Sequence, residues 1–299
     1  MVTLIENLRK IAVSNILETN SVKKIWPKWN LRLKKLTGNE PNATSILNLG
    51  DHLADIFKST SESGRSQGTL KGGGVSWEGL VGWYLNLCML GSRVVVVKMK
   101  KDIVPEPIRD ALTVSYGSFL SNTESDLLAI TFPNHNEYKT NLTETQKSIV
   151  EQKKLMDDLA ETHFSEYELG VIQCKTNWND NAQIPMLWDM VYHVKEFDVR
   201  NIRVGQNNYS LQDLKKFTYS FVTVPTQKNK FKKNSTPINR VSNLSGGNYW
   251  GQQTENGISR SLKEIFKNNF LGGMSSTIRD SLSLELTKLK TDYDYFRFP

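Results

Sequence analysis

The sequence predicts an α/β fold in which helices flank a mixed central sheet. Four short segments rich in β-branched or aromatic residues are predicted strands, at 93–99, 126–132, 167–175 and 216–224. Elsewhere, apolar residues recur at the i, i+3, i+4, i+7 spacing of one helix face. The resulting order of helix, strand, strand, strand, helix and strand indicates a mixed sheet.

Helices are predicted on both sides of these strands. Residues 3–36 have a helical pattern, and a turn at 38–41 separates them from a second helix at 43–57. The stretch 61–74 is rich in Gly and Ser, ends in three glycines, and is a predicted loop. The helices expected after it are 77–88 with Ser76 as its cap, a polar helical insertion at 137–161, and 185–194.

The composition is that of a globular protein. Its 299 residues are 38% hydrophobic, which is enough for a large core. The longest apolar stretches fall short of the roughly 20 residues that a membrane helix requires, and the N-terminus has no signal-peptide pattern. We therefore expect a cytoplasmic protein. Its two cysteines, Cys88 and Cys174, make neither a disulfide framework nor a zinc site.

The formal net charge of +7 favours an anionic partner. Basic residues concentrate in two clusters with interleaved aromatic residues, which are Trp26 and Trp29 in the first cluster and Phe231 in the second. A solvated face or a surface loop is an equally good interpretation of either cluster alone. The basic residues are Lys23, Lys24, Lys28, Arg32, Lys34 and Lys35 in the first cluster and Lys228, Lys230, Lys232 and Lys233 in the second.

A carboxylate and two polar residues occupy the ends of two predicted strands. Asp126 begins one strand, and Gln173 and Lys175 end another on a shared face, because alternate strand residues point the same way. We expect these residues to converge at one edge of the sheet. The Asp126 carboxylate, the Gln173 side-chain oxygen and the Cys174 carbonyl are hard oxygen ligands of the kind that Mg²⁺ takes. Lys175 could orient or help deprotonate a water, and Glu78 could reach the metal through water.

These are the groups that phosphodiester hydrolysis requires, but each also has a structural interpretation. An Asp that opens a strand often caps a turn, and a Lys that ends one often extends to solvent. The triplet 135–137 (HNE) lacks the clustered histidines and paired cysteines of a His-metal nuclease. The glycine-rich stretch before Glu78 lacks the Gly-Lys-Ser/Thr ending of a nucleotide-binding loop.

A Glu on a helix, an Asp at a strand and a Gln-x-Lys at a strand end, in that order, resemble the PD-(D/E)xK nuclease superfamily. The form VIQCK is similar to the Gln-x-Lys variant seen in Mrr-type restriction nucleases. The wider run GGGVSWEGLVGWYLN, TESDLLAITFP and EYELGVIQCKTNWNDNAQIPMLWDMVY resembles a type II restriction endonuclease of that superfamily over residues 72–192.

The resemblance implies a restriction-endonuclease-like core and a Mg²⁺-dependent, sequence-specific endonuclease of double-stranded DNA, as in a restriction-modification system. It also implies a homodimer that reads a palindromic site, with Glu78, Asp126, Gln173 and Lys175 as the catalytic residues. The alternatives are a DNA repair or junction nuclease, and a basic DNA-binding protein that has a nuclease-like core but does not cleave.

The sequence departs from the superfamily pattern in two ways. Ser125 stands where the superfamily name has proline, and Asp126 lies 47 residues before Gln173, which is a long separation that the helical insertion would explain. If Asp126 is not the metal ligand, the alternative carboxylates are Glu124, Glu166 and Glu168.

Three regions follow from this interpretation. They are a helical N-terminal segment (1–60), a nuclease core (61–224) and a C-terminal region for DNA recognition and dimerisation (225–299). The stretch 223–254 is rich in residues that pair with phosphates and base edges. It could also be an ordinary surface loop. The expected DNA contacts are Lys228, Lys230, Lys232, Lys233, Arg240, Asn248 and Gln252.

Overall fold

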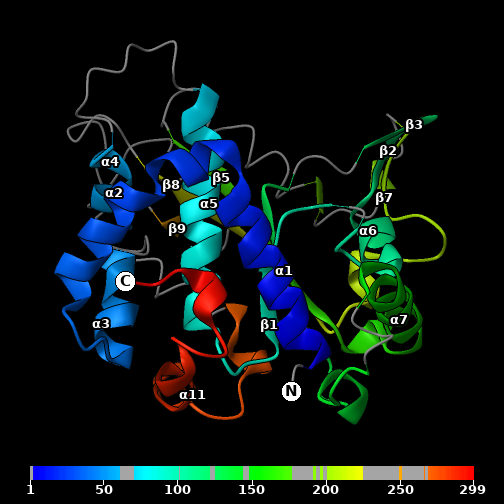
Figure 1. Ribbon diagram of the computed structural model, residues 1–299. Helices are drawn as coiled ribbons and strands as arrows, with labels where there is room; N and C mark the ends of the chain where they lie inside the picture. Colours follow the sequence, from blue (N-terminus) through cyan, green and yellow to red (C-terminus); the bar gives the residue numbers. More distant parts are fainter. Residues whose placement is uncertain are drawn as a thin grey trace.

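The four predicted strands lie side by side in one mixed sheet of the computed structural model (Figure 1). In sheet order the strands are β1 (Val94–Val97), β4 (Leu127–Thr131), β5 (Glu168–Lys175), β8 (Lys216–Thr223) and β9 (Tyr249–Trp250). The first three are antiparallel neighbours, whereas β8 runs parallel to both β5 and β9. The predicted α/β class with a mixed sheet is confirmed. The structure describes residues 3–60, 71–100, 102–121, 125–143, 148–176, 191–192, 196–197, 201–224, 249–250, 266 and 269–299.

Helices surround this sheet (Figure 1). The α-helices with described bounds are α1 (Leu4–Glu18), α2 (Asn20–Thr37), α3 (Ala43–Asn48), α4 (Leu53–Lys58), α5 (Lys71–Cys88), α6 (Glu106–Leu112), α7 (Ile149–Thr162) and α11 (Ile278–Glu285). Short 3-10 helices are η1 (Leu49–Asp51), η3 (Asn136–Tyr138), η5 (Phe164–Glu166), η8 (Leu211–Asp213), η9 (Leu271–Gly273), η10 (Leu286–Lys288) and η11 (Asp294–Phe296). Within these described residues, no helix has the length and hydropathy needed to cross a membrane.

The sheet has a hydrophobic core on each face. Helices α2, α3, α4 and α5 pack with one face through residues such as Trp29, Trp77 and Val96. Helices α6 and α7 pack with the other face through residues such as Ile108 and Leu128. Helix α1 contributes to both cores, because it lies along the edge strand β1. The helices of segment 1–60 therefore share a core with the sheet.

Buried side chains form hydrogen bonds with the backbone groups on the outer edge of β1. Arg9 of α1 donates from Nη1 to the Val94 carbonyl at 2.7 Å and from Nη2 to the Ser92 carbonyl at 2.9 Å. Asn86 of α5 accepts from the Val96 N–H at 3.0 Å and donates to the Val96 carbonyl at 2.7 Å. The side chain of Asn86 thus makes the two hydrogen bonds that a neighbouring strand would otherwise make.

The predicted helix at 3–36 is two helices. Thr19 has an extended backbone (φ −60°, ψ 127°), which ends α1 and begins α2. The break lets both helices pack on α5 at glycines: a Cβ at Gly79 would lie 2.7 Å from Val22 of α2, and one at Gly82 would lie 3.0 Å from Ile16 of α1. This close packing explains why two glycines are tolerated in the middle of α5.

Other predicted boundaries also change. The helix at 43–57 is α3, η1 and α4, and the helical insertion at 137–161 is η3 followed by α7. Helix α5 begins at Lys71, so the three glycines of the predicted loop are helical, and Ser76 is buried inside the helix instead of capping it. The cost of helical glycine, about 1 kcal/mol each, is offset by the buried apolar face that follows. Most of the predicted helix at 185–194 lies outside the described residues.

A second, smaller sheet was not predicted from the sequence. Its order is β3 (Phe119–Ser121), β2 (Val114–Tyr116), β7 (Ile202–Val204) and β6 (Glu196–Phe197), with antiparallel pairing throughout. It lies beside α6 at the upper right of Figure 1. Phe119 and Leu120 are 66% and 54% exposed. Strands this short with exposed apolar residues have no alternating pattern by which a sequence would reveal them.

Candidate functional site

The register of β4 and β5 sets Asp126 opposite Gln173. Leu127 pairs with Ile172, so the next position outward on each strand brings Asp126 and Gln173 to the same face at the end of the ladder. Asp126 Oδ2 accepts hydrogen bonds from Gln173 Nε2 and from the Cys174 backbone N–H, each at 2.7 Å. The structure therefore brings these three residues together at one edge of the sheet.

Charged groups surround this carboxylate. Lys175 ends β5 and acts electrostatically on Asp126, as does Glu78 from α5. Glu78 Oε2 forms an ion pair with Lys98 Nζ at 3.0 Å, and the two side chains are about one-fifth exposed. Five polar or charged side chains from α5, the end of β1, the start of β4 and the end of β5 thus lie at this end of the sheet, joined by one ion pair, one hydrogen bond and electrostatic interactions with Asp126.

Burial makes Asp126 a weaker acid than usual. It raises the pKa of this carboxyl from 3.8 to about 6, and Glu78 contributes to the rise, while Lys175, the Cys174 N–H and Lys98 oppose it. A carboxyl whose pKa is perturbed by burial and by specific charged neighbours is typical of a functional site. Burial also raises the pKa of the neighbouring Cys174 thiol, which favours the protonated, less nucleophilic form.

Aromatic residues support the site from one face of the sheet. The Tyr219 hydroxyl of β8 donates to Gln173 Oε1 at 3.4 Å, and the Tyr192 hydroxyl lies 3.4 Å from Ser125 Oγ. The rings of Tyr192 and Tyr219 are in contact, with centroids 6.2 Å apart. This packing holds Gln173 with its nitrogen toward Asp126 and its oxygen toward Tyr219.

The oxygen donors at this edge fit Mg²⁺. Carboxylates of Asp126 and Glu78 lie on adjacent elements, and the N–H and carbonyl of a strand residue point to the same side, so the Cys174 carbonyl faces the Asp126 side. Hard oxygen ligands of this kind suit Mg²⁺. Gln173 would have to turn its amide by half a rotation to offer its oxygen. In the orientation found here, Gln173 positions Asp126.

The alternative carboxylates lie elsewhere. Glu168 begins β5, five residues before Gln173 and therefore about 16 Å away along the strand, and it pairs with Lys215 at 2.8 Å. Glu166 precedes it and contacts two histidines. Glu124 lies outside the described residues. Of the alternative carboxylates, the two that the structure describes, Glu166 and Glu168, both lie away from the sheet edge where Asp126 lies.

Lys98 was not singled out from the sequence. It follows β1 directly in the run RVVVVKM and lies at the same end of the sheet as Asp126 and Lys175. A charge that directly follows a buried strand was the available signal. Its partner Glu78 is 20 residues away in the sequence, so the pairing depends on how α5 packs on β1.

All seven predicted DNA contacts fall outside the described part of the chain. This holds for Lys228, Lys230, Lys232, Lys233, Arg240, Asn248 and Gln252. In the N-terminal basic cluster, Trp26 and Trp29 are 6% and 0% exposed and belong to the core, so they are not stacking platforms for bases. Lysines of the same helix, including Lys24, Lys28 and Lys35, are exposed.

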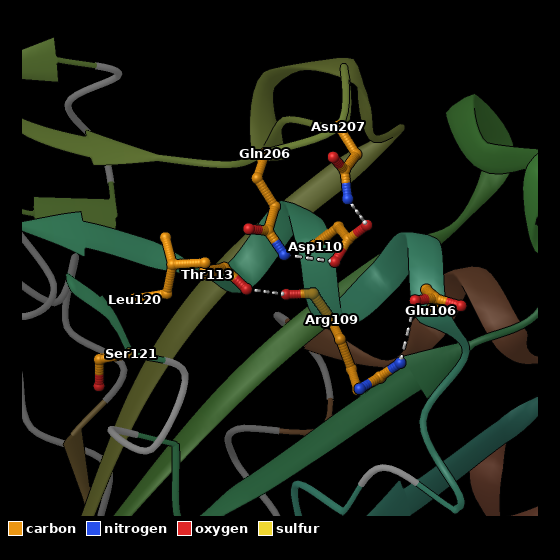
Figure 2. Close-up of a pocket in the computed structure, with 8 residues that line it drawn as sticks. All are labelled: Glu106, Arg109, Asp110, Thr113, Leu120, Ser121, Gln206 and Asn207. Atoms are coloured by element: carbon orange, nitrogen blue, oxygen red, sulfur yellow. Dashed lines mark hydrogen bonds and ion pairs between the residues drawn. The ribbon is translucent and has the colours of Figure 1, made fainter. Parts of the chain in front are cut away.

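A separate pocket lies between α6 and the second sheet (Figure 2). Its volume is about 290 Å³. The Asp110 carboxylate accepts from Gln206 Nε2 at 2.6 Å and from Asn207 Nδ2 at 2.9 Å, and Arg109 pairs with Glu106 at 3.6 Å. Because Asp110 is already engaged, these contacts serve to attach the turn after β7 to α6.

No protein-family model and no curated protein matches this chain.

Glu78 should contribute less than Asp126. Its carboxylate is held by Lys98 at 3.0 Å and would reach a metal only through water, so if the site hydrolyses DNA as the sequence predicts, we expect Glu78→Gln to slow that cleavage by about tenfold or less. Lys98→Ala, which frees Glu78, should have an effect of similar size. Single-turnover cleavage rates of both variants at saturating Mg²⁺ provide the measurement. A loss of about 100-fold or more would instead indicate that Glu78 binds the metal directly.

Proposed function

We propose that this protein is a Mg²⁺-dependent, sequence-specific endonuclease of double-stranded DNA with a restriction-endonuclease-like core. One observation carries the proposal. Asp126, Gln173 and the Cys174 backbone are joined by hydrogen bonds at a sheet edge where Lys175 and Glu78 also act on the Asp126 carboxylate. This is the grouping that the resemblance to type II restriction enzymes requires, and the +7 net charge suits a polyanionic substrate.

Each side chain has a defined task in this proposal. When bound, Mg²⁺ supplies Lewis-acid activation of the scissile phosphate and of a water. Asp126, ionised above its pKa of about 6, would hold the metal together with the Cys174 carbonyl. Gln173 orients the Asp126 carboxylate through its 2.7 Å hydrogen bond. Lys175 positions the attacking water and stabilises the negative charge that develops on the phosphate.

The proposed assembly is a homodimer in the cytoplasm that reads a palindromic site, as part of a restriction-modification system. Two equivalent sheet edges would then cut the two strands, and isologous pairing of identical subunits matches the symmetry of a palindrome. Residues 225–299 are the proposed region for recognition and dimerisation.

Incubation of the protein with phage DNA in the presence and absence of Mg²⁺ tests this function. We expect discrete fragments only with Mg²⁺. A smear of fragments would indicate nonspecific cutting or a repair-type nuclease instead of sequence-specific cleavage. DNA binding in a mobility-shift assay without any cleavage would contradict the enzyme proposal and favour a DNA-binding protein.

A further inference from the structure

Two histidines that are distant in the sequence meet at one carboxylate, at the end of β5 opposite to Asp126. His135 Nε2 lies 2.8 and 2.9 Å from the two oxygens of Glu166, and His163 Nδ1 lies 3.4 Å from Oε1 of the same group. The imidazole rings are stacked with centroids 4.1 Å apart. We propose that these three residues form a binding site for a transition-metal ion of the zinc class.

The ligand atoms have the spacing that such an ion needs. One nitrogen from each histidine and one Glu166 oxygen all lie within 4.8 Å of one another. Zinc binds nitrogen and carboxylate oxygen at about 2.0–2.2 Å, so its ligands lie about 3.3 Å apart in a tetrahedral site. The observed separations of 2.8 and 3.4 Å from Glu166 bracket that value. An imidazole nitrogen binds a metal in its own ring plane, and the stacked rings are only 21° from parallel, so one histidine has to turn out of the stack to complete the coordination.

Short structured elements hold all three ligands. His163 ends α7, where its N–H donates to the Leu159 carbonyl at 3.0 Å, and the Glu166 N–H donates to the His163 carbonyl at 2.9 Å. His135 directly precedes η3, whose Tyr138 is buried and hydrogen-bonded to Tyr167 at 3.0 Å. The backbone of all three ligands is thus held in place before any ion arrives, so the conformational cost of binding is confined to the side chains.

The donor set selects the class of metal. Two imidazole nitrogens and one carboxylate suit zinc, copper or nickel, whereas Mg²⁺ takes oxygen ligands. The histidine side chains are 37% and 16% exposed, and Glu166 is 48% exposed, so an ion can enter from solvent and keep a water in its remaining position. This is a different site from the oxygen-rich edge at Asp126.

A simple His–carboxylate ion pair is the competing explanation. It accounts for the short contact between His135 and Glu166, and it would exist without any metal. A metal ion instead uses both histidines at once and displaces the proton that His135 Nε2 shares with Glu166. The two explanations therefore differ in whether each histidine is required for Zn²⁺ binding.

Isothermal titration of ZnCl₂ into the full chain, prepared without a histidine tag and treated with chelator, tests the site. We expect one zinc ion per chain and a rise in the thermal unfolding midpoint with Zn²⁺. His135→Ala, His163→Ala and Glu166→Gln should each weaken binding at least tenfold, since losing even an outer-shell partner costs about 10–100-fold. His52→Ala and Glu161→Gln serve as matched controls and should bind as wild type does.

The Asp126→Ala variant separates this site from the proposed catalytic site. It should keep full Zn²⁺ affinity while losing Mg²⁺-dependent cleavage. Zinc affinity that is lost in Asp126→Ala, or unchanged in both His135→Ala and His163→Ala, would overturn the proposal. The absence of any zinc-dependent heat and any midpoint shift in the wild-type protein would do the same.

Discussion

Asp126→Ala and Lys175→Ala should each slow DNA cleavage at least 100-fold while leaving DNA affinity largely intact. The Asp126 carboxylate is the charged group around which Gln173, the Cys174 N–H and Lys175 are arranged. Removing a single electrostatic group from a catalytic site commonly costs about 10²–10³ in rate. Single-turnover cleavage and a mobility-shift titration in Ca²⁺ measure the two properties separately.

Matched substitutions control for a loss of cleavage that is caused by misfolding. Asp213→Ala changes an exposed aspartate before β8, and Lys10→Ala changes an exposed lysine on α1. Both should cleave DNA at the wild-type rate, and circular dichroism should show that all four variants are folded. Cleavage by Asp126→Ala or Lys175→Ala at close to the wild-type rate would refute the assignment of the site.

Asp126→Asn should stabilise the metal-free protein while destroying its activity. The folded protein raises the pKa of Asp126 from 3.8 to about 6, so at neutral pH the ionised carboxylate opposes folding. The corresponding free energy is at most about 3 kcal/mol, because the side chain keeps part of its contact with solvent. Asparagine removes the charge and can still accept the hydrogen bond from the Cys174 N–H.

The pH dependence of this difference has a definite sign. Since the folded pKa is above the unfolded one, the destabilisation is fully present above pH 6 and disappears as the pH falls toward 3.8. Urea unfolding at several pH values should therefore show the two proteins converging in acid. Asp213→Asn is the control that should match the wild type throughout. An Asp126→Asn protein less stable than wild type at neutral pH would contradict a buried, destabilising charge.

The sequence was sufficient to predict four of the five strands of the main sheet, all except β9, and the meeting of Asp126 with Gln173. Both depend on short-range rules, namely the apolar strand pattern and the alternation of faces along a strand. The register between β4 and β5 follows because the apolar side chains of both strands have to be buried on both faces of the sheet.

The features that were missed depend on packing between distant segments. The ion pair of Lys98 with Glu78 exists because α5 lies across the end of β1, and the break at Thr19 exists because both α1 and α2 reach the glycines of α5. The two histidines at Glu166 appear scattered along the chain and meet only when η3 docks against the end of α7. Local propensity contains none of this information.

Strand β1 is protected from intermolecular pairing by side chains instead of by another strand. An uncovered strand edge is a template for edge-to-edge aggregation, and VVVV is a strongly β-prone, uncharged segment. Arg9 and Asn86 occupy its hydrogen-bonding groups before another molecule can. Because both residues precede β1 in the chain, the ribosome synthesises the side chains that protect this strand edge before it synthesises the strand. A protein that loses α1 would uncover the Ser92 and Val94 carbonyls of this edge, so self-association would follow in addition to a loss of stability.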